Sequence, residues 1–176
     1  MNKNIISEFK LKSIFSNKLK KNDIKKICLL KDKEWKYGFK KQIKWFQKYV
    51  KNQDIHNLLY HKSKLVGYTL LRKRGCKING SNKKKFIFFD TLIIDKKYRG
   101  KKISYLLMAL NNMVIKRNKL FSILICKKKQ INFYKNNGWF QINNKNIQIL
   151  DHKFSSFCMI YSEKNINNKY ILWINK

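Results

Sequence analysis

The order of segments between residues 86 and 126 constrains the fold more than any other feature of this chain. Residues 86–94 form a dense apolar and aromatic run of strand length. A basic, glycine-containing loop follows and leads into a predicted helix at about 102–117, after which residues 120–126 form another short apolar run. Two strands joined through a helix usually lie parallel in one sheet. This segment therefore predicts a parallel pair of strands in the middle of a sheet.

The chain before residue 86 predicts a strand, two helices and a hairpin. In residues 8–15, Phe9, Leu11, Ser13 and Phe15 alternate with lysines, which indicates a strand with that apolar face buried. The other elements expected here are a helix capped by Asn22 or Asp23, a helix from about Tyr37 to Lys51, a hairpin of residues 56–60 and 65–72, and a loop at 75–85.

The chain after residue 126 predicts short elements. They are a helix at 129–137 that ends with Gly138 at the C′ position, a strand from Trp139, a strand at 154–161 and a last edge strand at 170–174. With 176 residues, the chain has room for one sizeable core. We therefore predict an α/β fold as a single domain over 1–176, with a mixed sheet of six to seven strands flanked by about four helices.

The charge of the chain is extreme. Lys and Arg number 42 against nine Asp and Glu, so the formal net charge is +33. A field of this sign attracts polyanions such as nucleic acid, a ribosome, a nucleotide-sugar or a phosphorylated cofactor. An AT-rich coding sequence, which favours Lys, Asn and Ile and leaves no Pro, is the other explanation. Hydrophobic residues make up 44% of the chain, too many for a disordered basic tail.

Several classes of protein are poorly supported. The four cysteines lie far apart without a C-x-x-C pair, so neither a disulfide framework nor a structural zinc is expected, and we predict no metal site. The apolar runs are shorter than a membrane span, and the start of the chain does not resemble an export signal. We therefore expect a cytoplasmic protein.

The loop before the helix at 102–117 is a candidate phosphate site. A helix start directs unpaired amides and the positive end of the helix dipole at one point. Gly100 lies in this loop, and Lys96, Lys97, Arg99, Lys101 and Lys102 surround it. A solvated basic loop is the alternative interpretation. Tyr134 also allows two interpretations. It is either a reactive phenol or an aromatic core residue beside Phe133.

Two motifs together resemble the acyl-CoA-binding half of the GNAT superfamily of N-acetyltransferases. The family patterns are Arg/Gln-x-x-Gly-x-Gly/Ala and Phe-Tyr-x-x-x-Gly-Phe/Trp. Here they read Arg99-Gly-Lys-Lys-Ile-Ser104 and Phe133-Tyr-Lys-Asn-Asn-Gly138-Trp139. The first departs from the family pattern, because Lys102 replaces the central glycine and Ser104 the final small residue. The resemblance implies an acetyl-CoA-binding core at about 86–140.

The resemblance implies roles for particular residues. Acetyl-CoA would be the acyl donor, and Tyr134 the general acid that protonates the departing thiolate. Asp90 is the first candidate for the general base and His56 the next. Cys126 is expected to be a core residue instead of a nucleophile. The implied cofactor-binding residues are Leu92, Ile93 and Ile94 along the pantetheine arm, and Arg99, Gly100, Lys101, Lys102, Ile103 and Ser104 at the pyrophosphate.

The acceptor implied by this resemblance is a primary amine that attacks the thioester directly. The positive charge favours an anionic acceptor, so a nucleotide-linked amino sugar comes first and a protein amine second. An aminoglycoside fits worst because it is itself a polycation. The alternative function is a non-catalytic nucleic-acid-binding protein that stacks bases on Trp35, Trp45 and Tyr98. A homodimer is left open.

Overall fold

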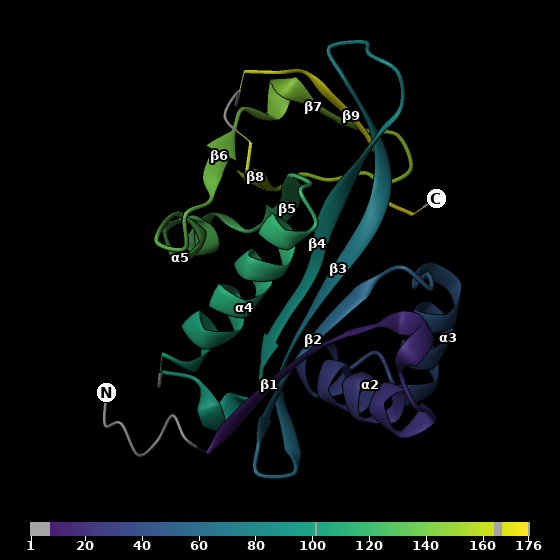
Figure 1. Cartoon of the computed structure of the whole chain (residues 1–176), viewed down its shortest axis with the longest axis vertical. Coiled ribbons are helices and arrows are strands. Elements are labelled where there is room, and N and C mark those ends of the chain that lie inside the picture. The colour runs from purple at the N-terminus through teal and green to yellow at the C-terminus, as the bar shows by residue number, and fades with distance from the viewer. Residues whose placement is uncertain (1–7, 101, 164–166, 176) are drawn as a thin grey trace. The chain divides into compact units, whose positions relative to one another are not determined.

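The computed structural model describes residues 8–100, 102–163 and 167–175. Within these residues the chain forms an α/β fold with a mixed sheet and four α-helices, which confirms the predicted fold class. The helices are α2 (Lys21–Trp35), α3 (Phe39–Tyr49), α4 (Ile103–Arg117) and α5 (Ile131–Lys135). The strands are β1 (Phe9–Phe15), β2 (Ile55–His61), β3 (Lys64–Ile78), β4 (Lys84–Ile94), β5 (Ser122–Cys126), β6 (Phe140–Ile142), β7 (Ile147–Ile149), β8 (Phe157–Tyr161) and β9 (Tyr170–Trp173) (Figure 1).

The chain forms two compact units. Unit 1 comprises Met1–Leu71 and Thr91–Asn111, and unit 2 comprises Arg72–Asp90 and Asn112–Lys176. Strands β3 and β4 and helix α4 each contribute residues to both units. The single domain expected over residues 1–176 stays a prediction.

Unit 1 is a sheet segment with helices on both faces (Figure 1). Strands β1, β2, β3 and β4 follow one another in hydrogen-bonded order, and β2 is antiparallel to both β1 and β3. Leu58 and Tyr68 face each other across β2 and β3 and pack against α2 and α3. Leu59 and Val66 instead pack against the first half of α4. The alternation of side chains along the strands thus supplies two cores, one on each face.

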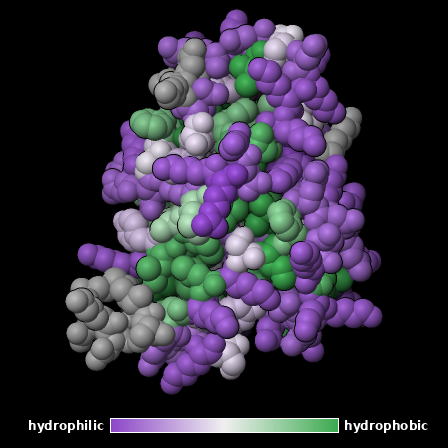
Figure 2. Space-filling model, in the orientation of Figure 1, coloured by the Kyte–Doolittle hydropathy of each residue, from purple (hydrophilic) through white to green (hydrophobic). Residues whose placement is uncertain are grey.

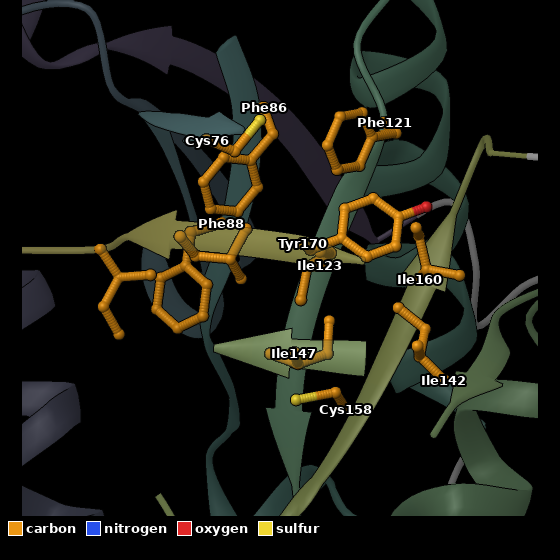
Figure 3. Packing of buried hydrophobic residues seen from close by; sticks show 12 residues of the cluster. Cys76, Phe86, Phe88, Phe121, Ile123, Ile142, Ile147, Cys158, Ile160 and Tyr170 are labelled. Carbon is orange, nitrogen blue, oxygen red and sulfur yellow. The ribbon is translucent and has the colours of Figure 1, made fainter. Parts of the chain in front are cut away.

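Unit 2 has its own core on one face of its sheet. Strand β5 lies parallel to β4 and antiparallel to β8, which confirms the predicted parallel pair. The rings of Phe86, Phe121 and Tyr170 contact one another in this core, with centroids 5.8 Å and 5.7 Å apart (Figure 3). Cys76 lies beside Phe86, and Cys158 lies beside Ile147 in the same core (Figure 3). All four cysteines are free and buried.

Some predicted boundaries were wrong. Helix α2 begins after Lys20, and Asp23 is not its cap but an acid in its first turn that accepts from the Lys20 amide at 3.2 Å. The loop predicted at 75–85 is shorter in the structure and spans 79–83, because the residues on either side of it extend β3 and β4. Strand β9 is not an edge strand, since it pairs with both β3 and β7, and β7 itself was not predicted.

The apolar face predicted for β1 is not buried throughout. Leu11 is 40% and Phe15 42% exposed, whereas Ile14, which breaks the alternation, packs against the core formed by α2 and α3. In the part of the chain that the structure describes, β1 pairs only with β2. An edge strand has a neighbour on one side alone, so most of this face stays in solvent.

Hydrophilic side chains cover most of the face shown in Figure 2. Among the described residues, no helix is both long enough and apolar enough to cross a membrane. The same residues contain no group of three or more His, Cys, Asp or Glu side chains placed to hold a metal ion.

Candidate functional site

Strand β4 continues well beyond its pairing with β5. The parallel ladder joins Ile87–Phe89 to Ser122–Leu124, and β4 then runs five residues further, to Ile94. Leu92 and Ile94 pack with α4, and Ile93 packs with α2 and α3. In the described chain, the ladder between β4 and β5 does not extend to Leu92–Ile94. This end of β4 therefore has covered faces and one edge whose peptide groups can accept an added extended chain.

Backbone hydrogen bonds connect the region of β4 to two different neighbours. The amide of Ile87 donates to Phe121, just before β5 (3.0 Å), whereas the amide of Asp95, just after β4, donates to Val66 of β3 (2.8 Å).

Asp95 organises the loop that follows β4. Its carboxylate accepts from the Lys97 amide at 3.2 Å and lies 3.5 Å and 3.8 Å from the ammonium groups of Lys33 and Lys64. Burial works in the opposite direction, but the hydrogen bond from Lys97 and the two lysine charges together lower the pKa of Asp95. The sequence analysis missed this residue. The signal was present, because an Asp directly before a basic turn is a preferred cap.

Arg99 holds the same loop from the other end. Its Nε donates to the Ile94 carbonyl at 2.9 Å, and its guanidinium forms an ion pair with Glu34 of α2. The guanidinium of the predicted cofactor-binding Arg99 therefore bonds to the protein itself in this structure. Glu34, also missed by the sequence analysis, fixes the loop through this contact.

The described part of this loop combines two left-handed residues with the start of a helix. Gly100 and Lys102 have positive φ angles of 77° and 57°, and α4 begins directly afterwards at Ile103. The amides of Ile103 and Ser104 lie in the first helical turn, where no earlier carbonyl of the helix can accept from them. Concave runs of amides at a helix start bind phosphate groups. Lys101, also predicted to bind the cofactor, lies outside the described residues.

Lys102 keeps a left-handed backbone although its side chain disfavours it. This lysine replaces a glycine of the family pattern, and it has a φ angle that glycine adopts most easily. A left-handed conformation costs an ordinary L-residue about 1–2 kcal/mol. The shape of the loop thus survives the substitution at the cost of local strain.

We predict that Lys102→Gly retains acetyl-CoA binding, whereas Lys102→Val weakens it about tenfold. Both substitutions remove the same charge, but a β-branched residue is a severe outlier at this φ angle. Calorimetric titration of both variants measures the difference. Lys119, which has a φ angle of 52° just after α4, supplies the control, because Lys119→Val should leave binding unchanged. Equal affinities of the two Lys102 variants would show that the loop backbone does not bind the cofactor.

A cavity of about 330 Å³ opens beside this loop within unit 1. Ile93 and Ile94 form part of its apolar wall, and its polar lining includes Lys33, Lys64 and Asp95. The remaining lining residues are Leu30, Glu34, Lys96 and Lys97. An apolar wall with basic groups around it suits a ligand that carries both an apolar arm and an anionic group.

Tyr134 lies in an aromatic cluster of unit 2. It is 6% exposed, and its ring contacts Phe89 and Trp139 at centroid distances of 6.2 Å each. Burial first, and then the nearby Cys126, raise the pKa of Tyr134 well above its ordinary value. The phenol therefore stays protonated at physiological pH. A protonated phenol can donate a proton, but the raised pKa also makes it a weaker acid than an exposed tyrosine.

The second motif determines where this cluster forms. The amide of Gly138 donates to Lys135 at 2.9 Å and the amide of Trp139 to Tyr134 at 3.1 Å, and Gly138 has a φ angle of 80°. These bonds form the Schellman ending that glycine favours, and the prediction of Gly138 at C′ is confirmed. Trp139 is then buried, with its Nε1 donating to Asn112 of α4 at 3.1 Å.

Cys126 ends β5 close to this cluster. It is 4% exposed, and burial raises the pKa of its thiol to about 11. The thiol is therefore protonated at physiological pH and is a poor nucleophile. This agrees with the expectation of a core residue.

Asp90 forms an ion pair with Arg72 inside unit 2. The Nη1 of Arg72 donates to Asp90 Oδ2 at 2.6 Å, with side-chain exposures of 3% and 17%. The same guanidinium lies 5.9 Å from the centroid of the Phe88 ring. Asp90 is thus partly accessible, and Arg72 fixes its orientation.

His56, the other predicted base, is packed inside unit 1. Its Nε2 lies 2.7 Å from Ser16 Oγ, its Nδ1 lies 2.8 Å from the Tyr68 hydroxyl, and its ring stacks on Phe46. No part of His56 is exposed. Burial, followed by the charge of Lys31, lowers its pKa to about 3. A base must reach its substrate, so this geometry supports a packing role for His56.

We predict that His56 makes the protein less stable in mild acid. Below the ordinary pKa of 6.5, the unfolded chain binds a proton that the folded chain excludes, so stability falls as the pH drops from about 6.5 towards 3. Between pH 7.5 and 5 the loss should be about 2 kcal/mol. Urea unfolding at both pH values should show this part of the loss in the wild type and not in His56→Gln. An identical pH dependence of both proteins would contradict the prediction.

The comparisons with known proteins rest on structure alone. No family model and no curated protein matches the sequence. An acyl-CoA N-acyltransferase from Pseudomonas aeruginosa is similar with a TM-score of 0.66 and 10% identity, over 88% of this chain and 99% of that one. An acetyltransferase of the GNAT family from Staphylococcus aureus is similar with a TM-score of 0.56 and 19% identity, over 86% of this chain and 98% of that one. The PaiA N-acetyltransferase from Thermoplasma acidophilum, solved with coenzyme A, is similar with a TM-score of 0.54 and 18% identity, over 86% of this chain and 98% of that one.

The chain therefore has the fold of GNAT-superfamily N-acetyltransferases, which confirms the fold that the resemblance implied. The names of these three proteins describe acyl or acetyl transfer, and one of them was solved with coenzyme A. Identities of 10–19% establish a shared fold and leave the reaction to be argued from this chain's own residues.

Proposed function

We propose that this protein is an acetyl-CoA-dependent N-acyltransferase that acts on a primary amine. The observation that carries the proposal is the loop after β4, where Gly100 and Lys102 both have positive φ angles directly before α4. Lys102 holds this conformation against its own preference. Lys36, Lys62 and Lys119 also have positive φ angles, so the proposal rests on the combination of this loop conformation with the unpaired amides at the start of α4.

The proposed roles on the binding side fall within unit 1. The amides at Gly100 and at Lys102–Ser104 would bind the pyrophosphate. The open edge of Leu92–Ile94 would pair with the peptide-like pantetheine arm, as an added strand does. Arg99 and Asp95 would act indirectly, by fixing the loop through their bonds to Ile94 and Lys97.

The proposed reaction is direct acyl transfer. The amine nitrogen forms a bond to the acyl carbon, the carbon–sulfur bond breaks, and the acetyl group leaves the thioester as an amide. The departing thiolate takes the phenol proton of Tyr134, and the proton of the attacking amine passes to the carboxylate of Asp90. The role of Tyr134 is carried over from its place in the second motif, since a phenol with the ordinary pKa of about 10 is protonated at physiological pH without any shift. A covalent acyl-enzyme is not part of the proposal, because the Cys126 thiol is buried and protonated.

An anionic acceptor fits the charge of the chain best. A net charge of +33 attracts phosphorylated acceptors and repels polycations. We therefore place a nucleotide-linked amino sugar first and a protein amine second. The nucleotide-linked sugar should show a lower KM than the same amino sugar without its nucleotide, and added salt should reduce that difference.

The test of the donor is calorimetric titration with acetyl-CoA at moderate salt. ADP and an unrelated polyanion serve as controls, because a protein this basic holds any polyphosphate loosely. Stoichiometric binding that exceeds both controls would support the proposal. Binding no tighter than that of the polyanion would contradict it.

A further inference from the structure

Helix α3 carries a row of exposed lysines along one face. Lys40, Lys44 and Lys48 are four residues apart, so they lie on one side of the helix at intervals of about 6 Å. Lys41 is exposed next to them. The opposite side of the helix packs into the core of unit 1 through Phe46. The row is therefore a continuous positive surface on a rigid element.

Nothing in the described chain neutralises this row. Helix α3 contains no acidic residue, and no carboxylate of the described residues lies within ion-pair distance of Lys40, Lys44 or Lys48. The nearby acids have other partners, since Asp32 accepts from the Gly38 amide at 2.6 Å and Glu34 binds Arg99. Like charges four residues apart destabilise a helix. The helix thus bears an unfavourable charge pattern that a polyanion would relieve.

Aromatic side chains run beside the lysine row. Trp35, the last residue of α2, is 38% exposed, and Tyr37, in the turn between α2 and α3, is 62% exposed. The ammonium of Lys31 lies 3.4 Å from the ring centroid of Trp45 and 5.8 Å from that of Trp35, so these two rings flank one lysine. Trp45 in turn lies 5.8 Å from Tyr49, one turn further along α3. Aromatic rings accordingly follow the helix on the side next to the lysines.

We propose that this surface, called the α3 face and formed by Lys40, Lys44, Lys48, Trp35 and Tyr37, binds single-stranded nucleic acid. Regularly spaced cations bind the phosphate backbone, and exposed aromatic rings stack on unpaired bases. Duplexes keep their bases stacked inside, so the aromatic rings favour a single strand. No residue of the α3 face lines the cavity beside the loop after β4, and its function does not depend on the proposed acyl transfer.

The test compares two variants with the same loss of charge. The first is Lys40→Gln/Lys44→Gln/Lys48→Gln on the α3 face. The second, a control, changes three exposed lysines of β1 and the β2–β3 turn, as Lys10→Gln/Lys12→Gln/Lys62→Gln. Fluorescence anisotropy with labelled U20 and dT20 measures binding across a salt series. The α3 variant should bind more weakly than the control, and its salt slope should fall by about 2 units relative to wild type.

A single substitution tests stacking without a change of charge. Tyr37→Ala should weaken binding of U20 about five- to a hundredfold, and the side chain is exposed enough for the fold to be retained. Comparing the affinities for U20 and dT20 shows whether the protein prefers RNA or DNA.

Three results would overturn the proposal. Equal losses of affinity in the two triple variants would mean that binding depends only on net charge. Displacement of U20 by acetyl-CoA would place the nucleic-acid site at the loop after β4. Binding to phosphatidylserine vesicles as tight as that to U20, with the same sensitivity to the α3 variant and to Tyr37→Ala, would make the α3 face a membrane surface.

Discussion

Tyr134→Phe should reduce kcat about 100-fold or more and leave the Kd for acetyl-CoA unchanged. The substitution removes only the hydroxyl group, so the ring contacts with Phe89 and Trp139 persist. A positioned general acid typically contributes 10²–10⁴-fold to the rate. Without it, the departing thiolate must take a proton from water. Steady-state kinetics with a saturating amine, together with calorimetry, measure the two quantities separately.

Tyr161 supplies the matched control for this prediction. It is buried in the same aromatic cluster and stacks on Trp139 with centroids 5.3 Å apart. Tyr161→Phe therefore makes the same chemical change in a similar environment, and it should leave kcat within a few-fold of wild type. Equal rate losses in the two variants would mean that the hydroxyl groups support packing. An unchanged rate in Tyr134→Phe would exclude this phenol as the acid.

The regular parts of the fold could be predicted from periodicity. Phe39, Ile43 and Phe46 of α3 and Val50 at its C-cap recur at spacings of four, three and four, and all four contribute to the core of unit 1. Residues 86–126 gave the strand–helix–strand unit whose parallel pairing the structure confirms. These predictions succeed because burial of one face imposes the period of the element on the sequence. Strand β7 has only three residues, which is too few for a period to appear.

Contacts between distant residues could not be predicted in this way. Asp90 and Arg72 lie 18 residues apart, and Arg99 and Glu34 lie 65 residues apart. No local pattern marks such pairs, because the fold alone brings them together. His56 illustrates the consequence. Its residue type suggested a base, but its neighbours Ser16 and Tyr68 place it in the core. In contrast, Gly138 was predictable because a helix ending needs only local geometry.

Removing one partner of the Arg72–Asp90 ion pair should destabilise unit 2 strongly. Arg72→Met leaves the carboxylate without its 2.6 Å donor, and Asp90→Asn leaves a guanidinium that is 3% exposed without its counter-charge. Breaking a buried pair from one side costs about 3 kcal/mol or more, mainly because a charge stays desolvated.

Replacing both partners with apolar residues removes this penalty. The double variant Arg72→Met/Asp90→Leu should therefore regain most of the lost stability. Urea unfolding of the wild type, the single variants Arg72→Met and Asp90→Leu, and this double variant gives the coupling energy. Additive losses would mean that the two charges do not depend on each other.

The double variant also separates the two roles proposed for Asp90. If Asp90 is the general base, the double variant should be folded and should bind acetyl-CoA with the wild-type Kd, yet its kcat should fall about 100-fold or more. The loss should shrink at high pH, where the amine acceptor deprotonates without help. If the pair only stabilises unit 2, the double variant should recover its activity together with its stability. A stable variant with wild-type kcat across the pH range would therefore remove Asp90 from the mechanism and assign proton removal to water.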